Sequence, residues 1–405
     1  MREARAMNQQ DTIISLTETY SAHNYHPLPV VLTKGEGVWV WDVEGRRYLD
    51  CLSAYSALNQ GHRHPAIIDA LTAQAGRITL TSRAFHNDRM GKFLQLLCKT
   101  AGMEMALPMN TGAEAVETAI KAARKWGYTR KGVPQDQAEI IVCNENFHGR
   151  TTTAVSLSSD PDTRRDFGPF TPGFKWVPFG DAAALAEAMT ENTVALILEP
   201  IQGEAGINVP PDGYLRECRR ICDRHNALFV VDEIQTGLGR TGALFCHQHE
   251  DGADPDMMIL GKALGGGVYP VSAVVSSREI LGVFQPGDHG STFGGNPLAC
   301  EVARASLRVI LDEGLAERSR YLGARLYERL RSLNSPRIKE VRGRGLMIGV
   351  EIDKAHGPAR PICEALMRRG VLCKETHEQV IRLAPPLVIQ ESEIDWLGDQ
   401  MAAIL

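Results

Sequence analysis

The stretch Met257-Met258-Ile259-Leu260-Gly261-Lys262-Ala263-Leu264-Gly265-Gly266-Gly267 joins an apolar run directly to a lysine and a series of glycines. Four consecutive apolar residues before a glycine predict a strand buried in a sheet. The stem of Lys262 should therefore be enclosed, and its amine should face a crevice that the glycines let a ligand approach closely. Partial removal from water lowers the pKa of a lysine, as Schiff-base formation requires. We predict that Lys262 is such a nucleophile and not one of the solvated surface lysines.

Polar residues also follow two preceding apolar runs. Val194–Leu198 leads into Glu199-Pro200-Ile201-Gln202-Gly203-Glu204, and Leu228–Val231 leads into Asp232-Glu233-Ile234-Gln235-Thr236-Gly237. Because ligands of open α/β sheets bind beyond the carboxyl ends of the strands, these segments and the lysine should meet in one crevice. Asp232 can pair there with a protonated pyridine nitrogen, and its alternative role is a helix N-cap. The strand–helix unit that separates Asp232 from the lysine favours the cofactor role.

The organisation of the chain predicts two domains, because 405 residues exceed the roughly 250–300 at which a single core stops growing. Apolar runs alternate with helical patterns, which is typical of an α/β fold with a parallel sheet. The remaining predicted strands are Ile140–Cys143, Ser272–Val275 and Leu346–Ile352, and the predicted helices are Ala113–Tyr128, Asp212–Asn226, Leu298–Glu313 and an amphipathic one ending at Arg331. Helix, strand and helix should follow from Pro361 to Leu405. We place a large domain at residues 55–310, and a small one at residues 1–54 and 311–405.

Composition narrows the class of protein. A net charge of −5 gives no electrostatic case for nucleic acid or an anionic membrane as a partner. No apolar run approaches the roughly 18–20 residues that span a bilayer. The segment Met1–Thr12 lacks the apolar core of a signal peptide, and we expect a few unstructured residues in it. Together these features predict a cytoplasmic protein. The nine scattered cysteines fit a reduced compartment. Cys218, Cys222 and His225 lack a second ligand pair, so no metal site is predicted.

Two further segments suit a phosphorylated aromatic ligand. Asn110-Thr111-Gly112-Ala113 opens a predicted helix, whose free N–H groups and positive dipole end favour a phosphate. Phe147-His148-Gly149-Arg150-Thr151 follows a predicted strand and offers an aromatic face. Arg150 adds a bidentate site for a carboxylate.

Five motifs together resemble the class III pyridoxal 5′-phosphate (PLP)-dependent aminotransferases of fold type I. They are Asn110-Thr111-Gly112, Phe147-His148-Gly149-Arg150-Thr151, Asp232-Glu233-Ile234-Gln235-Thr236-Gly237, Leu260-Gly261-Lys262-Ala263 and Gly290-Ser291-Thr292-Phe293-Gly294-Gly295-Asn296-Pro297. The likeness runs from about Tyr20 onward. It implies a large α/β domain with a mostly parallel seven-stranded sheet between helices, a smaller α+β domain, PLP as cofactor and a homodimer or higher oligomer.

The resemblance assigns a cofactor role to eight residues. Lys262 forms the Schiff base and transfers protons, Asp232 binds the pyridine nitrogen, and Gln235 binds the 3-oxygen. Phe147 stacks on the ring with His148 beside it, Gly112 and Ala113 bind the phosphate, and Thr292 binds the phosphate of the neighbouring subunit. The ornithine aminotransferases of animals, which belong to this family, have tryptophan at the position of His148. This difference concerns the packing of side chains near the ring.

Three segments resemble the ornithine aminotransferase branch of this family, namely His23–Val30, Ser53–His62 and Ile381–Ile389. By this resemblance Tyr25 and Arg150 bind the ornithine α-carboxylate, Tyr55 lines the pocket, and Glu204 and Arg382 form a switchable ion pair. A static structural salt bridge is the alternative for that pair.

The resemblance implies transfer of the δ-amino group of ornithine to 2-oxoglutarate, so the expected partners are small amino acids and 2-oxo acids. An acetylornithine or other ω-amino acid aminotransferase is the alternative enzyme. A catalytically silent PLP-binding scaffold is a more remote alternative, which the intact Lys262, Asp232 and Arg150 disfavour.

Overall fold

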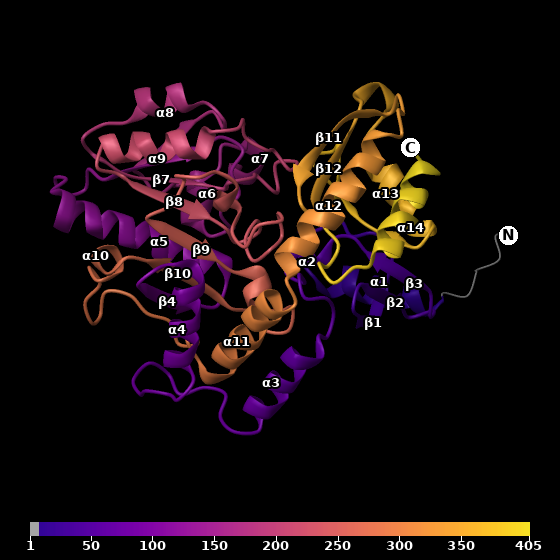
Figure 1. The fold of residues 1–405 in the computed structure, drawn as a ribbon, viewed down its shortest axis with the longest axis horizontal. Helices are drawn as coiled ribbons and strands as arrows, with labels where there is room; N and C mark the ends of the chain where they lie inside the picture. Colours follow the sequence, from indigo (N-terminus) through magenta and orange to yellow (C-terminus); the bar gives the residue numbers. More distant parts are fainter. Residues whose placement is uncertain (1–7) are drawn as a thin grey trace.

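A seven-stranded sheet forms the centre of the computed structural model, which describes residues 8–405 (Figure 1). The strands lie in the order β4 (Met105–Met109), β10 (Ser272–Ser276), β9 (Met257–Leu260), β8 (Leu228–Asp232), β7 (Thr193–Leu198), β5 (Glu139–Cys143) and β6 (Phe174–Val177). Only β10 runs against its neighbours, and the other strand pairs are parallel. The carboxyl ends of β7, β8 and β9 therefore lie at one edge of the sheet, as the sequence predicts.

Helices cover both faces of this sheet because its inner strands are apolar on both sides. In β8, Val230 packs in one cluster with α5 (Gly112–Trp126), whereas Val231 packs in the other cluster with α9 (Tyr214–Arg224) and α11 (Pro297–Asp312). All residues of β7, β8 and β9 are buried. The sheet is thus a rigid support for the loops that follow these strands.

Two four-stranded sheets form the smaller part of the molecule, on the right of Figure 1. One has the order β1 (Leu32–Glu36), β2 (Trp39–Asp42), β3 (Arg47–Asp50) and β13 (Val371–Leu372), and the other has the order β11 (Ile338–Arg344), β12 (Met347–Ile352), β15 (Val380–Leu383) and β14 (Lys374–Thr376). Strand β13 pairs in parallel with β3. This pairing joins the N-terminal segment to the C-terminal part of the chain.

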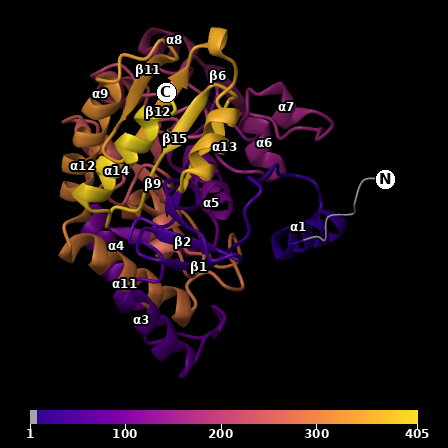
Figure 2. The same cartoon turned by 90° about the vertical axis from the view of Figure 1, so that its right-hand side faces the viewer.

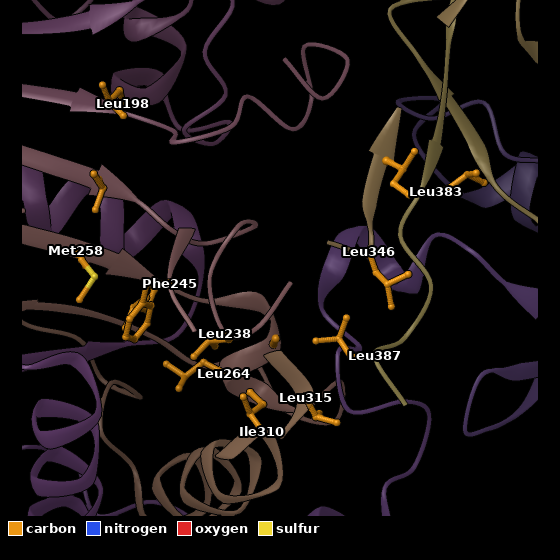
Figure 3. Packing of buried hydrophobic residues seen from close by; sticks show 14 of the residues in the cluster. Leu198, Leu238, Phe245, Met258, Leu264, Ile310, Leu315, Leu346, Leu383 and Leu387 are labelled. Atoms are coloured by element: carbon orange, nitrogen blue, oxygen red, sulfur yellow. The ribbon is translucent and has the colours of Figure 1, made fainter. Parts of the chain in front are cut away.

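One hydrophobic cluster connects the two parts. Figure 3 shows side chains of this cluster, from Leu198 and Met258 on the central sheet to Leu346 and Leu383 in the smaller part of the molecule. Helix α12 (Leu315–Arg331) follows α11 directly and contributes to the same cluster. The other helices are α1 (Gln9–Tyr20), α2 (Ser53–Ser56), α3 (Pro65–Ala75), α4 (Met90–Ala101), α6 (Thr152–Leu157), α7 (Pro161–Arg164), α8 (Ala182–Ala188), α10 (Arg278–Leu281), α13 (Arg360–Arg368) and α14 (Glu391–Ala402).

A buried arginine also links the two parts. The guanidinium of Arg240 donates hydrogen bonds to Asn59 Oδ1 at 2.6 Å, to the Leu346 carbonyl at 2.9 Å and to the Pro385 carbonyl at 2.7 Å. Burial lowers the pKa of Arg240 to about 9. Because these acceptors come from three distant segments, Arg240 fixes the smaller part against the central sheet.

The predicted strands and helices lie within a few residues of those observed, but several observed elements were not predicted, among them β1, β2, β3 and β11 of the small sheets. The edge strands β4 and β6 were not predicted, and three short strands, β13, β14 and β15, stand where one was expected after Pro361. Helix α1 begins at Gln9, inside the segment predicted to be unstructured, and residues 1–7 lie outside the described part of the chain. Figure 2 shows α1 beside the main body, in agreement with its lack of buried residues. Among residues 8–405, no helix is long and apolar enough to cross a membrane.

Candidate active site

Lys262 lies directly beyond the carboxyl end of β9. Gly261 separates it from the strand, and Lys262 has a φ of 44°, in the left-handed region that few non-glycine residues adopt. Burial lowers the pKa of Lys262 below its ordinary value, and the charge of Arg382 adds to this effect while the Glu204 carboxylate opposes it. The structure therefore provides the desolvated amine that the sequence predicts.

A cavity of 210 Å³ lies around this lysine. Its lining comes from the ends of several strands and from the start of α5, and consists of Gly112, Ala113, Phe147, His148, Gly149, Glu199, Asp232, Ile234, Gln235 and Lys262. Seven of the eight residues predicted to bind a cofactor line this cavity. The eighth, Thr292, is exposed on the loop before α11.

Asp232 and His148 form a buried pair in the wall of this cavity. The Asp232 Oδ2 atom lies 2.7 Å from His148 Nδ1, and Asp232 Oδ1 accepts a hydrogen bond from the Ile234 N–H at 3.1 Å. Burial alone would lower the pKa of His148, but the bond to Asp232 and its charge raise it overall. The His148 Nε2 atom is buried without a hydrogen-bond partner among the described residues. A turn and not a helix follows Asp232, so the alternative role as a helix N-cap is excluded.

Glu199 is a third ionisable group in this wall. The sequence placed its segment at the crevice but assigned Glu199 no role. It directly follows β7 and is 6% exposed. Its carboxylate accepts hydrogen bonds from the backbone N–H groups of Phe147 at 2.9 Å and Gly203 at 3.1 Å. Burial raises the pKa of Glu199 to about 7, and the His148 charge opposes that rise. Its place at a strand end, like that of Asp232, is the signal that could have singled it out within that segment.

The start of α5 also lines the cavity, through Gly112 and Ala113. Thr111 and Glu114 form a reciprocal capping box there. The cap uses the N–H groups of Thr111 and Glu114, whereas the first N–H groups of a helix have no acceptor within it. Gly112 and Ala113 therefore present N–H groups where an anion can bind. The side chain of Asn110 donates to Ser291 Oγ at 2.9 Å, which holds the loop of Thr292 beside this helix.

A larger cleft of 820 Å³ opens next to this cavity and shares Phe147, His148 and Gly149 with it. All five residues predicted to bind substrate line the cleft, namely Tyr25, Tyr55, Arg150, Glu204 and Arg382. Tyr25, Tyr55 and Arg382 come from the segments before residue 56 and after residue 370, whereas Arg150 and Glu204 follow strands of the central sheet. The structure thus brings the predicted substrate residues together.

Glu204 and Arg382 form an ion pair at the inner end of the cleft. Arg382 Nη1 lies 2.6 Å from Glu204 Oε1, and Gln235 Nε2 donates to the same oxygen at 3.0 Å. Although burial would raise the pKa of Glu204, the charge and hydrogen bond of Arg382 lower it to about 2. The Arg382 guanidinium also lies 5.0 Å from the centre of the Tyr55 ring.

Tyr55 is held on an unusual turn. All four residues of α2, Ser53 to Ser56, have positive φ values between 47° and 68°. Left-handed backbone costs roughly 1–2 kcal/mol for each non-glycine residue, so the surrounding structure must hold this turn in place. The turn directs Tyr55 toward the cleft and the Arg382 guanidinium.

Arg150 and Tyr25 lie at the outer end of the cleft. The Arg150 guanidinium is 5.3 Å from the centre of the Phe147 ring and donates to Thr163 Oγ1 at 3.4 Å. No carboxylate of the described residues pairs with Arg150, so its charge is available to a ligand. Tyr25 is 70% exposed, and Arg360 holds the segment after it by hydrogen bonds to the carbonyls of His26 and Pro27.

No group of three or more His, Cys, Asp or Glu residues in the described chain is placed to hold a metal ion. Cys218 and Cys222 are buried on α9 in the hydrophobic cluster. They pack as apolar groups there.

Comparison with known proteins gives consistent results for sequence and structure. The family model for class-III aminotransferases matches residues 20–405. An ornithine aminotransferase of Geobacillus sp. (strain WCH70) is 63% identical over 98% of this chain and 99% of its own length. The ornithine aminotransferase of Bacillus subtilis (strain 168) is 59% identical over 99% of both.

Two solved structures extend this comparison. The ornithine aminotransferase from Toxoplasma gondii ME49 superposes with a TM-score of 0.96 at 45% identity, over 98% of this chain and 95% of that one. An acetylornithine aminotransferase from Elizabethkingia anophelis superposes with a TM-score of 0.89 at 47% identity, over 98% and 99%. The predicted family, the likeness to ornithine aminotransferases and the fold class are all confirmed. The chain therefore belongs to the class III aminotransferases, which are PLP-dependent enzymes of fold type I.

Proposed function

We propose that this enzyme transfers the δ-amino group of L-ornithine to 2-oxoglutarate and binds PLP in the 210 Å³ cavity. The observation that carries the proposal is the arrangement of two adjoining sites, a reactive lysine in one and the Glu204–Arg382 pair with Arg150 in the other. A curated relative named ornithine aminotransferase at 63% identity supports the choice of substrate. The products are glutamate 5-semialdehyde, which cyclises spontaneously, and glutamate.

The residues present suit PLP. Lys262 supplies an amine for the aldehyde, Asp232 a buried carboxylate for the pyridine nitrogen, and α5 an N-terminus for the phosphate. The buried His148 Nε2 atom has no partner among the described residues, so a polar ligand group can satisfy it. A Cβ atom on Gly203 would lie 2.2 Å from Gln235 Oε1, so glycine there leaves room for Gln235 to face the cavity. When bound, PLP supplies an electron sink for negative charge at the reacting carbon.

The protein side chains supply binding and proton transfer. The Nζ atom of Lys262 takes the proton from Cδ of ornithine, and its lowered pKa leaves more of the amine unprotonated for this step. Arg150 and Tyr25 hold the α-carboxylate at the far end of the cleft, with Tyr55 along its wall. Fixing the substrate in this way converts the proton transfer into an intramolecular step.

One cleft must accept two substrates in opposite orientations. Ornithine presents its distal amine, and while Glu204 neutralises Arg382 no free charge draws the α-carboxylate to the wrong end. Glutamate presents its α-amine, so Arg382 must leave Glu204 and bind the α-carboxylate while Arg150 binds the γ-carboxylate. A single ion pair thus gives the enzyme two specificities.

Further proposals concern the assembly. We propose that Thr292 binds the cofactor phosphate of a neighbouring subunit in a homodimer, because it is exposed and lines neither cavity of its own chain. We also propose that the domains divide at residues 54 and 310. The proposed location of the protein is the cytoplasm.

An amine-donor panel with 2-oxoglutarate tests the function. Ornithine, N-acetylornithine and 4-aminobutyrate are compared by kcat/KM, and cyclised semialdehyde is trapped as the product. Ornithine should be the best donor. A preference for N-acetylornithine would instead support the alternative that the Elizabethkingia anophelis structure represents.

A further inference from the structure

We propose that Asp160 binds the α-ammonium group of the amino acid whose α-carboxylate Arg150 holds, so that the outer end of the cleft recognises a zwitterion. This inference rests on the proposed function and identifies the residue that selects free ornithine among ω-amino donors. Asp160 lies on the cleft wall with Arg150, Tyr25 and Tyr55. It precedes the short helix α7.

A chain of hydrogen bonds connects Asp160 to Arg150. Arg150 Nη1 donates to Thr163 Oγ1 at 3.4 Å, and Thr163 Oγ1 donates to Asp160 Oδ2 at 2.7 Å. A cation and an anion therefore lie one hydroxyl group apart on the same wall. The α-end of an amino acid carries the complementary charges on one carbon, so both can be bound at once.

The other carboxylates of the cleft are less suited to this role. Glu204 is paired with Arg382, and Glu375 is paired with Arg360 and Lys374. Glu145 is exposed and has no described contact with Arg150. Asp160 has no ion-pair partner among residues 8–405, and so it can accept an ammonium group.

Asp160 is held in place and ionised. Its Oδ1 atom accepts a hydrogen bond from the Asp162 N–H at 2.9 Å, which fixes the carboxylate at the start of α7. Partial burial would raise the pKa of Asp160, but the Thr163 hydroxyl and the backbone N–H groups of Asp162 and Thr163 lower it overall. The charge of His377, which also lines the cleft, lowers the pKa of Asp160 further.

The substrates themselves provide a test of this role. Ornithine carries an α-ammonium, whereas 5-aminovalerate is the same chain without it. N-Acetylornithine has a neutral amide at that position, and 2-oxoglutarate has no ammonium at all. Loss of the Asp160 charge should therefore affect ornithine alone, while a displaced Arg150 would affect every substrate with a carboxylate at that end.

The experiment compares single turnovers of the wild type and Asp160→Asn. Enzyme loaded with PLP is mixed with ornithine or 5-aminovalerate, and enzyme loaded with pyridoxamine 5′-phosphate is mixed with 2-oxoglutarate. Asparagine is also a good helix N-cap, so α7 should keep its start. We expect kcat/KM for ornithine to fall about tenfold, as for loss of one charge-assisted hydrogen bond. The values for 5-aminovalerate and 2-oxoglutarate should stay unchanged. Asp162→Asn is the matched control, because this substitution makes the same charge change two residues away. The carboxylate of Asp162 pairs with Arg165.

Three results would overturn the inference. One is an unchanged ornithine rate in Asp160→Asn, and another is an equal fall for ornithine and 5-aminovalerate, which indicates a structural effect on Arg150. The third is a selective loss of ornithine in Glu145→Gln instead. The proposed function is judged separately from the wild type, since it fails if the unaltered enzyme does not turn over ornithine.

Discussion

Arg382 and Glu204 form an ion pair with Nη1 and Oε1 2.6 Å apart, at a position where Arg382 is only 2% exposed. Removing one partner of such a pair leaves an uncompensated buried charge, which is strongly unfavourable. The Arg382 Nε atom has no partner among the described residues, so the guanidinium is not fully satisfied. A substrate carboxylate can therefore compete with Glu204 for Arg382. This favours the proposed switchable pair over a static salt bridge, and the Glu204→Ala variant tests the choice.

Glu204→Ala should move the enzyme from δ-amines toward α-amines. Arg382 would then carry a free charge that attracts the α-carboxylate of either ornithine or glutamate. We expect the half-reaction with glutamate to become at least about tenfold faster relative to ornithine, since tenfold corresponds to about 1.4 kcal/mol. Single-turnover rates measured from the cofactor absorbance check this.

The control for this variant is Glu340→Ala, which removes an exposed carboxylate that pairs with Arg342 outside the cleft. It should leave the preference as in the wild type. An unchanged preference in Glu204→Ala would support the static salt bridge.

Arg150→Gln should weaken both half-reactions. The Arg150 guanidinium has no carboxylate partner among the described residues, so its loss leaves no buried charge and should not alter folding. We expect kcat/KM for ornithine and for 2-oxoglutarate each to fall at least about tenfold, because both place a carboxylate there. If only one substrate were affected, the common carboxylate site would be wrong.

Lys262→Ala should greatly slow turnover while the cofactor cavity stays intact. General-base catalysis contributes typically about 10²–10⁴-fold, so the residual rate should be at least about 10²-fold lower. Added methylamine should restore part of the rate, because a small amine can occupy the space of the missing side chain. Lys339→Ala, at an exposed lysine paired with Glu351, is the control and should keep full activity.

The predictable part of the fold and site follows from the buried strands. Strands β7, β8 and β9 are apolar runs because both faces are covered, so their ends, with Asp232 and Lys262, could be located from the sequence. The two strands of the central sheet that were not predicted, β4 and β6, are its edges. Strand β4 contains Pro108, which argues against a central strand, and β6 has a half-exposed pattern without an apolar run.

Contacts between distant segments could not be predicted in this way. Arg240 is fully buried because its three acceptors arrive from residues 59, 346 and 385, and no local pattern encodes that meeting. The left-handed turn of Tyr55 uses Ser and Ala and no glycine, so the sequence carries no turn signal there. The bond between His148 and Asp232 likewise depends on the packing of β5 and β8 in one sheet.

Glu199→Gln should change the pH dependence of stability. Burial raises the pKa of Glu199 to about 7 from an ordinary 4.5, so the folded protein binds a proton more tightly than the unfolded chain between these values. The free energy of unfolding should therefore fall as the pH rises from 4.5 to 7, by up to about 3 kcal/mol. Glutamine resembles the protonated carboxyl group and keeps one acceptor for the Phe147 or Gly203 N–H. The variant should lack this component of the pH dependence and be the more stable protein at pH 8.

Denaturant unfolding of both proteins, stripped of cofactor and compared at pH 5 and pH 8, measures the effect. Cofactor is omitted because ligand binding would add its own stabilisation. The difference between wild type and variant isolates Glu199, because all other titrating groups are common to both. At pH 5 the two should be nearly equal, and at pH 8 the variant should be ahead. A difference that does not vary with pH would mean that Glu199 is already ionised at pH 5, held so by His148 and its two backbone N–H donors.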